Sequence, residues 1–256
     1  MMAIPVKNAA ELEAMRVSGR MTAEVLRQVA EAVQPGVTTG ELDALTRRLI
    51  GGMGAKPSFL GYRGYPGAIC ISINDEVIHG IPGSRVVQPG DVVSLDVGVY
   101  YNGFNGDSAT TVMVGVRDPD TVRLVEATRR ALAAGVAAAR PGARLSDVSH
   151  AVESVARASG CSVVREFVGH GVGRHLHEEP QIPNYGLPGR GPVLKPGMTL
   201  AIEPMVNLGR PEVAVLDDGW TVVTRDGKPS AHFEHTVAVL EEGAEILTRP
   251  ENLQTL

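Results

Sequence analysis

Residues 94–115 read SLDVGVYYNGFNGDSATTVMVG, and this stretch predicts a β-hairpin. Apolar residues alternate along residues 93–99, which is the pattern of a strand with one buried face. Two Asn-Gly pairs follow, at 102–103 and 105–106, and Asn-Gly is among the strongest short-range signals for a hairpin turn. The segment after them alternates again, so the chain is expected to return as a second strand.

Two acids occupy the interior of this hairpin, Asp96 on the first strand and Asp107 on the second. Because they are nearly equidistant from the turn, we expect their carboxylates to be opposite each other or one diagonal step apart. Facing residues have Cβ atoms about 4.5–5.5 Å apart. Two like charges that close repel each other, and each loses hydration if it is buried. We therefore expect a nearby positive charge that offsets the repulsion between the two carboxylates.

Composition sets broad limits. The chain has 256 residues, a hydrophobic content of 43% and a net charge of −5. We expect one large domain or two tightly fused halves with a substantial core, no dedicated nucleic-acid binding, and no membrane span. The N-terminal residues resemble the lead-in to a helix and not a signal peptide. Cys70 and Cys161 are too few for a disulfide framework, so a reducing cytoplasm is the expected location.

The sequence contains an internal echo at an offset of 106–107 residues. The segment VQPGVTTGELDALTRRL at 33–49 resembles ARPGARLSDVSHAVESV at 139–155, and QPGDVVSLDV at 88–97 resembles KPGMTLAIEP at 195–204. The echo predicts a duplicated half made of a helix, a Pro-Gly turn, a helix and antiparallel strands. In this alignment Asp96 corresponds to Glu203, so the two acids should face each other across a central pseudo-twofold axis.

Hydrophobic periodicity predicts an α+β fold. Apolar residues at helical spacing predict helices over 9–32, 40–51, 119–139 and 145–158. Alternation predicts strands over 68–73, 91–100, 107–116, 198–204 and 232–240.

Acids also lie in the second half, on strands that should be half-buried. Glu203 precedes a proline on one strand, and Glu234 shares a face with His232 and Thr236 on another. The glycine-rich stretch FVGHGVGRHLHEEP at 167–180 adds several histidines, among them His170. Solvated faces or ordinary ion pairs would explain any one acid, but no basic residue lies within the acidic strand segments.

A divalent metal centre would neutralise this set. Four carboxylates and one imidazole, from Asp96, Asp107, Glu203, Glu234 and His170, suit two divalent cations better than one. Oxygen-rich ligation without thiolate favours Mn(II), Fe(II) or Co(II), with Zn as a further option. The segment HEEPQ at 177–181 lacks the second histidine of the H-E-x-x-H zinc-protease motif, and its proline would break the helix which that motif needs.

Six motifs together resemble the type I methionine aminopeptidase family. They are VIHGIP (77–82), SLDVG (94–98), NGDSATT (105–111), GHGVGRHLHEEP (169–180), AIEP (201–204) and FEHT (233–236). The resemblance implies the pita-bread fold with pseudo-twofold symmetry. It also implies a single catalytic domain over 1–256, with halves of roughly 10–116 and 117–245.

The resemblance also implies roles for individual residues. Asp107 and Glu234 would bridge two metal ions, Asp96 would chelate one, and His170 and Glu203 would complete the other. Glu203 would shuttle protons, His177 would stabilise the tetrahedral intermediate, and His79 would contact the substrate near the scissile amide. The implied reaction is attack of a metal-bridging hydroxide on the first peptide carbonyl.

The implied substrates are peptides or nascent chains with an N-terminal methionine and a small second residue, with the ribosome as one place of encounter and a monomeric enzyme. The methionine pocket would be formed by the residues that the family resemblance indicates, namely Phe59, Tyr62, Tyr65, Cys70, Leu176 and Trp220, with His79 and His177 at its edge. Family members more often carry Phe at position 176 and a smaller residue at position 59. These two departures concern the shape of the pocket and leave the implied chemistry intact.

Two other functions stay open at this point. An X-Pro aminopeptidase or prolidase would use the same fold, although such relatives usually carry an additional N-terminal domain. A non-catalytic binding protein on the same fold would have lost its metal ligands, whereas all five ligand positions are intact here.

Overall fold

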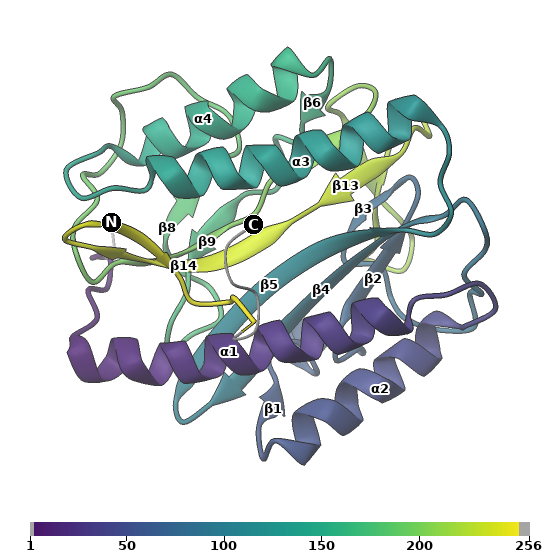
Figure 1. Ribbon diagram of the computed structural model, residues 1–256, viewed down its shortest axis with the longest axis horizontal. Coiled ribbons are helices and arrows are strands. Elements are labelled where there is room, and N and C mark those ends of the chain that lie inside the picture. Colours follow the sequence, from purple (N-terminus) through teal and green to yellow (C-terminus); the bar gives the residue numbers. More distant parts are fainter. Residues whose placement is uncertain (1–2, 251–256) are drawn as a thin grey trace.

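A central antiparallel sheet with two pairs of helices makes up most of the protein (Figure 1). The structure is a computed structural model, which describes residues 3–250. The helices are α1 (Ala9–Ala32), α2 (Thr39–Gly52), α3 (Pro119–Ala138) and α4 (Leu145–Ala158), with a short 3-10 turn at Tyr62–Gly64. The four predicted helices are confirmed to within one residue at each end.

The strands are short except in the central hairpin and in the strand beside it. In chain order they are β1 (Lys56–Pro57), β2 (Cys70–Ile73), β3 (Glu76–Ile78), β4 (Val92–Tyr101), β5 (Phe104–Met113), β6 (Ser162–Val163), β7 (Gly169–Gly171), β8 (Glu178–Ile182), β9 (Thr199–Ile202), β10 (Met205–Asn207), β11 (Val213–Val215), β12 (Val222–Thr224), β13 (Ser230–His232), β14 (Glu234–Leu240) and β15 (Gly243–Ile246).

Nine strands form the main sheet, in the order β1-β4-β5-β14-β9-β7-β8, with β2 also paired to β4 and β15 to β14. Two three-stranded sheets, β13-β10-β6 and β11-β12-β3, complete the fold. The pairing of β5 with β14 joins the two parts of the chain at the middle of the main sheet, where Ala109 lies opposite Glu234. Residues far apart in the sequence are thereby brought next to the central hairpin.

The predicted hairpin is formed by β4 and β5, and its register places the two acids one diagonal step apart. Asp96 lies opposite Ala109, and Gly98 lies opposite Asp107. Diagonal neighbours are within reach of the same bound group because their side chains point to one face. The prediction for the two carboxylates is therefore confirmed.

Helix α1 packs closely against the back of this hairpin. A Cβ atom added to Gly106 of β5 would lie 2.9 Å from the Cα of Gly19 and 2.6 Å from the Thr22 hydroxyl. A side chain larger than hydrogen at Gly106 would push the helix off the sheet. One apolar core lies beneath α1 and α2 and a second beneath α3 and α4. In Figure 1 the two helix pairs, purple and teal, run along opposite halves of the sheet.

The two helix pairs are held to the rest of the chain by matching contacts. The N–H of Gly36 donates to the carbonyl of Val87, and the N–H of Gly142 donates to that of Leu194, each at 2.9 Å. Isolated bridges at 38–86 and 144–193 repeat the correspondence. Each contact recurs 106 or 107 residues along the chain, which is the offset seen in the sequence. The division into halves at 10–116 and 117–245 within one catalytic domain stays a prediction.

Two strand predictions need correction. Strand β9 ends at Ile202, so Glu203 lies just beyond a strand and not on it. The predicted strand over 232–240 is broken at Phe233, where β13 of one sheet ends and β14 of another begins. The Phe233 N–H donates to the carbonyl of Pro204 at 3.3 Å. Glu234 is therefore the first residue of its strand.

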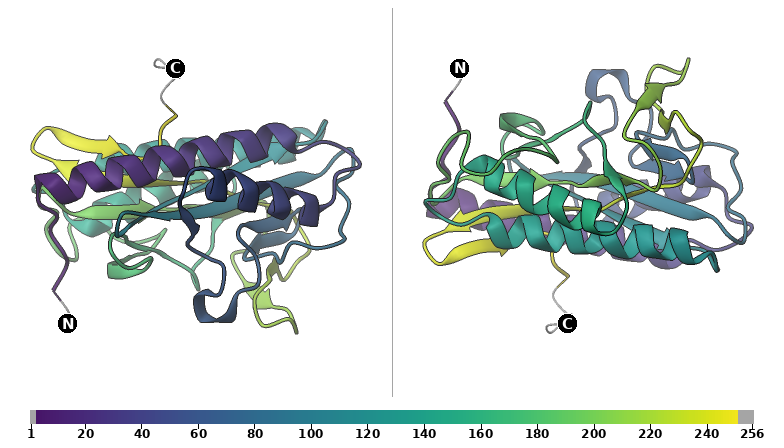
Figure 2. Two further views of the ribbon diagram at one scale, coloured as in Figure 1. Left: turned by 90° about the horizontal axis from the view of Figure 1, so that it is seen from below. Right: turned by 90° about the horizontal axis from the view of Figure 1, so that it is seen from above.

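The side of the main sheet away from α1 and α3 carries two projecting segments. Both views in Figure 2 show the blue chain around residues 58–65 and the green strands β11 and β12 standing out together on that side. Tyr65 and Trp220 make an edge-to-face contact there, with ring centroids 5.1 Å apart. Within residues 3–250, no helix is long and apolar enough to span a bilayer.

Candidate active site

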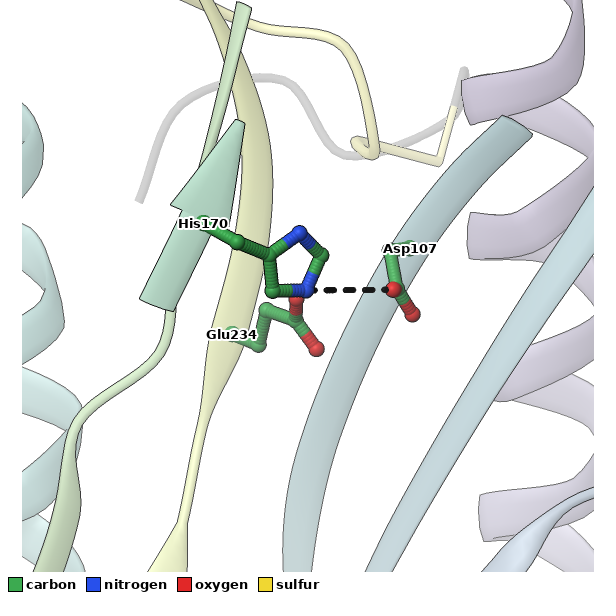
Figure 3. Close-up of side chains that lie close together, drawn as sticks. All are labelled: Asp107, His170 and Glu234. Carbon is green, nitrogen blue, oxygen red and sulfur yellow. Dashed lines mark ion pairs between the residues drawn. The ribbon is translucent and has the colours of Figure 1, made fainter. Parts of the chain in front are cut away.

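Three of the predicted ligands converge where β5, β14 and β7 lie next to one another. Figure 3 shows the ring of His170 directed from β7 towards Asp107 on β5, with Glu234 of β14 beside both. One ligand atom from each of these residues lies within 4.8 Å of the other two, and all three residues are buried. The Nε2 atom of His170 is 3.8 Å from the Asp107 carboxylate.

The other two predicted ligands adjoin this group. A carboxylate oxygen of Glu203 lies 3.5 Å from Nε2 of His170. Asp96 is the diagonal neighbour of Asp107, and its carboxylate lines the same cavity. The structure thus brings together all five side chains that the sequence singled out as candidate metal ligands.

Backbone contacts fix where these side chains start. The Thr236 hydroxyl accepts the N–H of Asp107 and donates to its carbonyl, at 3.0 and 2.8 Å. The Ser108 hydroxyl donates to the carbonyl of Glu234 at 2.8 Å. The Asn184 amide donates to the carbonyl of Glu203 at 3.0 Å. Because β5 and β14 are tied through side chains as well as through the ladder, the acids have little freedom to move apart.

Three of the acids each have a carboxylate oxygen without a hydrogen-bond partner in the described part of the chain. Asp96 Oδ1, Asp107 Oδ1 and Glu234 Oε1 are buried and accept no hydrogen bond from any residue in the described part of the chain. Burial raises the pKa of Asp96 to about 7. Burial, and then the charges of neighbouring acids, raise the pKa values of Asp107 and Glu234 well above their ordinary values. Carboxylates in this condition fit a divalent cation, because an ion would supply both the missing charge and the missing contacts.

The imidazole of His170 is set up as a ligand. Its Nδ1 lies 2.9 Å from the carbonyl of Gly171, so this nitrogen carries the proton and Nε2 keeps its lone pair. Burial, together with His177, lowers the pKa of His170 to about 3, which keeps the ring neutral. A Cβ atom at Gly171 would lie 2.1 Å from the carbonyl of Glu179. The backbone can therefore bring His170 this close only because its neighbour is glycine.

The five side chains form the floor of a cavity of about 170 Å³. Its walls include every residue predicted for the substrate pocket, namely Phe59, Tyr62, Tyr65, Cys70, His79, Leu176, His177 and Trp220. Phe59, Tyr65, Cys70 and Leu176 form one apolar cluster, with Tyr62 and Trp220 packed against it. Burial raises the pKa of the Cys70 thiol, so this sulfur is an apolar wall and not a nucleophile.

His177 stands between the pocket and the acids. Its ring stacks on Tyr62 with centroids 5.2 Å apart and lies 4.1 Å from the ring of His170. Burial, and then the charge of Arg63, lower the pKa of His177 to about 4. The ring is therefore a neutral hydrogen-bond donor at physiological pH.

The loop before His177 is tied to the hairpin turn. Asn105 of β5 donates its side-chain amide to the carbonyls of Gly173 and Arg174, at 3.0 and 3.2 Å. Its backbone N–H also donates to Gly173, at 2.8 Å. The hairpin therefore fixes the acids and helps to fix the histidine loop.

His79 lies at the edge of the cavity in a left-handed backbone conformation, with φ of 61°. Its ring makes edge-on contacts with Phe167 and Trp220, with centroids 5.8 and 6.0 Å away. Burial lowers the pKa of His79 to about 4. A positive φ is uncommon for histidine, and such strain collects at functional sites.

Several residues at or beside the site were given no role by the sequence analysis. Phe167, Val168, Ile78 and Arg63 line the cavity, and His232 lies behind Glu203, with Nε2 3.8 Å from the second carboxylate oxygen. The signal for His232 was its predicted position on the same face as Glu234. Phe167 stands in the quoted glycine-rich stretch but shows nothing in the sequence to distinguish it from a core residue.

A larger groove, of about 1100 Å³, lies between α1 and α3 on the other side of the main sheet. It is lined by alanine, arginine and other side chains and contains none of the residues predicted for the site. The clustered acids and histidines make the smaller cavity the candidate active site.

Comparison with known proteins agrees with this site. Residues 13–241 match the model of the metallopeptidase family M24. The chain is 53% identical over 243 residues to methionine aminopeptidase 1 of Bacillus subtilis, covering 95% of this chain and 98% of that protein.

Solved structures agree as well. The crystal structure of a methionine aminopeptidase from Thermotoga maritima matches with a TM-score of 0.95 and 48% identity, over 96% of this chain and all of that one. The Pyrococcus furiosus prolidase, at 24% identity and a TM-score of 0.77, shares the fold over 66% of its own chain. The fold is the predicted pita-bread fold, and the chain belongs to the metallopeptidase family M24.

Proposed function

We propose that the protein removes the N-terminal methionine from peptides and nascent proteins whose second residue is small. One observation carries the proposal: a small cavity with an apolar wall of aromatic and sulfur-containing side chains ends on a floor of four acids and a neutral histidine. Such a cavity accepts one unbranched apolar side chain and presents its backbone to the acids. The similarity to methionine aminopeptidases over nearly the whole chain supports the same reading.

Asp96, Asp107, His170, Glu203 and Glu234 would hold two divalent cations. Asp107 and Glu234, whose ligand atoms lie within 4.8 Å of each other and of a ring nitrogen of His170, would be shared by the two ions. Asp96 would serve one ion, and His170 with Glu203 the other. The mixture of carboxylates with one imidazole suits Mn(II), Fe(II) or Co(II) better than Zn(II). When bound, such ions lower the pKa of water and polarise a peptide carbonyl.

Glu203 is the proposed proton carrier. It reaches the floor from a segment outside the strands, and one of its oxygens points to His170 while the other points to His232. Burial, and then the charge of Asp96, raise the pKa of Glu203 well above its ordinary value. A carboxyl with a raised pKa can accept a proton during attack on the peptide and return it to the leaving amine.

His177 and His79 are the proposed donors to the substrate backbone. Both rings are neutral and lie on the cavity wall, so each can offer an N–H without bringing a positive charge to a free amine. His177, next to His170, would donate to the oxygen on which negative charge develops. His79, held on its strained turn beside Trp220, would contact the scissile amide.

The methionine side chain would lie among Phe59, Tyr65, Cys70 and Leu176, with Tyr62 and Trp220 closing the pocket. A thioether makes favourable contacts with aromatic rings. With this pocket filled, the second side chain lies where the walls that carry His79 and His177 approach each other. Glycine, alanine or serine should fit there, while leucine, lysine or phenylalanine should clash.

A peptide series that varies only the second residue tests the proposal. We expect Met-Ala and Met-Gly peptides to be cleaved at least ~10²-fold faster, in kcat/KM, than Met-Leu or Met-Phe peptides, because a misplaced amide alone costs about that factor. An acetylated Met-Ala peptide should resist cleavage, since the free amine is part of recognition. Similar kcat/KM values for Met-Ala and Met-Phe would replace the proposal with a broad aminopeptidase.

Two further substrate results would change the assignment. Preferred cleavage of X-Pro peptides would make the protein a prolidase-type hydrolase. Binding of metal without cleavage of any peptide would make it a binding protein on the same fold. The expected encounter at the ribosome, the monomeric state and the cytoplasmic location stay predictions.

A further inference from the structure

His232 lies beside the candidate active site, and the proposed function assigns it no role. It is 1% exposed, and its Nε2 has no hydrogen-bond partner among residues 3–250. Buried polar groups in native proteins are nearly always paired, so an unpaired nitrogen next to a catalytic carboxylate calls for an explanation.

The backbone of His232 is held firmly. Its N–H donates to the Thr111 hydroxyl at 3.0 Å, and the same hydroxyl donates to the His232 carbonyl at 2.7 Å. His232 also lies opposite Met205 in the pairing of β13 with β10. Met205 comes two residues after Glu203, so the segment with the acid and the strand with the histidine are tied together. These contacts therefore fix the backbone position from which the imidazole of His232 extends.

Glu203 lies between two imidazoles. One oxygen, Oε1, is 3.5 Å from Nε2 of His170, and the other, Oε2, is 3.8 Å from Nε2 of His232. Both separations are longer than a hydrogen bond. Contacts of catalytic groups often shorten only when the site is filled. A small rotation of the Glu203 side chain would bring Oε2 within bonding distance of His232.

We propose that His232 is a positioning residue for Glu203, donating its Nε2–H to Oε2 so that only Oε1 faces the cation shared with His170. The inference rests on the proposed function, because it concerns how one of the proposed ligands is oriented. A ligating carboxylate is commonly held by a hydrogen bond from outside the metal site, and loss of that partner typically weakens metal binding by ~10–100-fold. Without His232, Glu203 could turn both oxygens to the ion or swing away.

The alternative hypothesis is that His232 itself ligates the ion through Nε2. The two hypotheses differ in whether Nε2 of His232 carries a proton. A positioning histidine carries a hydrogen on Nε2, whereas a ligand offers a lone pair there. They also differ in which substitution preserves the role of His232. A glutamine side-chain amide can donate a hydrogen bond as Nε2–H does, but it is a poor metal ligand.

The test is a titration of Co²⁺ into metal-free protein. Binding is monitored by calorimetry and by the visible absorption spectrum of the bound ion. The set is wild type, His232→Gln, His232→Leu and, as a matched loss of an exposed imidazole, His150→Leu. We expect the Co²⁺ affinities of His232→Gln and of the His150→Leu control to stay within about 3-fold of wild type. The His232→Leu variant should bind the weaker of the two Co²⁺ ions ~10–100-fold less tightly, and the spectrum of its bound ion should change. Equal loss in the Gln and Leu variants would make His232 a ligand and overturn the proposal. Unchanged binding in the Leu variant would overturn it too.

A measurement on the unaltered protein guards against a Leu variant that fails to fold. In Zn²⁺-loaded wild type labelled with ¹⁵N-histidine, the proposal requires a proton on Nε2 of His232. A bare or metal-bound Nε2 would overturn it. These results do not depend on peptide cleavage, so a protein that binds metal normally but fails to cleave Met-Ala would refute the proposed function and leave the role of His232 decided. Absence of metal binding in wild type would overturn both.

Discussion

Lys7 and Glu178 form an ion pair across most of the chain, with Nζ 2.5 Å from Oε2 and side chains only 5% and 7% exposed. Lys7 precedes α1, and Glu178 opens β8 immediately after His177. The second carboxylate oxygen accepts the N–H of His175 at 3.1 Å. The pair therefore fastens the segment before the first helix to the loop that brings His177 to the cavity.

Breaking this pair should be costly. We expect Lys7→Met to lower the free energy of unfolding by about 3–5 kcal/mol, because the Glu178 carboxylate is left buried without its partner. Chemical denaturation followed by circular dichroism measures the change. The double variant Lys7→Met/Glu178→Met should regain most of the loss, since an apolar pair needs no charge compensation. As a control, breaking the half-exposed pair of Arg27 with Glu24 should cost at most ~1 kcal/mol. A double variant no more stable than the single one would refute the explanation.

Metal should stabilise the folded protein through the clustered acids. We expect Mn²⁺ at about 100 times its Kd to add roughly 2.7 kcal/mol per site to the free energy of unfolding, seen as a rise in Tm that chelator reverses. Asp107→Ala and Glu234→Ala should abolish most of the rise, because each removes a proposed bridge between two ions. Asp147→Ala, in the first turn of α4 and outside the acid cluster, is the matched loss of a carboxylate and should keep the full response. A rise in Tm that survives both bridge substitutions would place the ions elsewhere.

Without metal, stability should depend on pH through Asp96. Burial raises the pKa of this carboxyl from 3.8 to about 7, so between these values the folded protein binds more protons than the unfolded chain. The contribution of neutral Asp96 is therefore fully present below pH 3.8 and is lost as the pH rises to about 7. Asn has no such dependence, so we expect the stability of Asp96→Asn relative to wild type to increase across that range.

Urea denaturation of both proteins in chelator, at several pH values from about 4 to 7, measures the difference. Comparing the two proteins cancels the opposite dependence of the buried histidines, whose pKa values are lowered. With saturating Mn²⁺ the order should reverse, since the ionised carboxylate then has its cation. A difference that does not change with pH would show that Asp96 is not held neutral in the metal-free protein.

Loss of His177 should affect the reaction more than binding. We expect His177→Ala to lower kcat by ~10²–10³-fold with a small change in KM, because its proposed hydrogen bond forms to charge that develops in the transition state. Steady-state kinetics with a Met-Ala peptide separates the two parameters. An effect confined to KM would instead assign His177 to ground-state binding.

Much of the framework follows from local patterns. The hairpin with its diagonal acids is set by alternation and by two Asn-Gly turns, which need no information from elsewhere in the chain. The four helices follow from hydrophobic periodicity, and the structure adds local caps such as the reciprocal contacts of Thr38 with Glu41. These interactions lie within a few residues of one another, so the sequence alone predicts them.

The missed features depend on long-range pairing. Alternation continues through Phe233 without a signal, and the chain changes sheets there because the Pro204 carbonyl, from another part of the chain, accepts its N–H. The same change of sheet places His232 behind Glu203, whereas the local pattern shows only that His232 shares a face with Glu234. The partner of Lys7 is 171 residues away, and neither residue shows in its own neighbourhood that it will be buried.

The seam between β5 and β14 also bears on how the protein could be divided. Asp96 and Asp107 come from one side of this seam, and His170, Glu203 and Glu234 come from the other. A chain cut between β5 and α3 would separate two of the five side chains from three without removing any of them. Each fragment alone should be inert, and activity on mixing would report directly whether two polypeptides can rebuild one sheet.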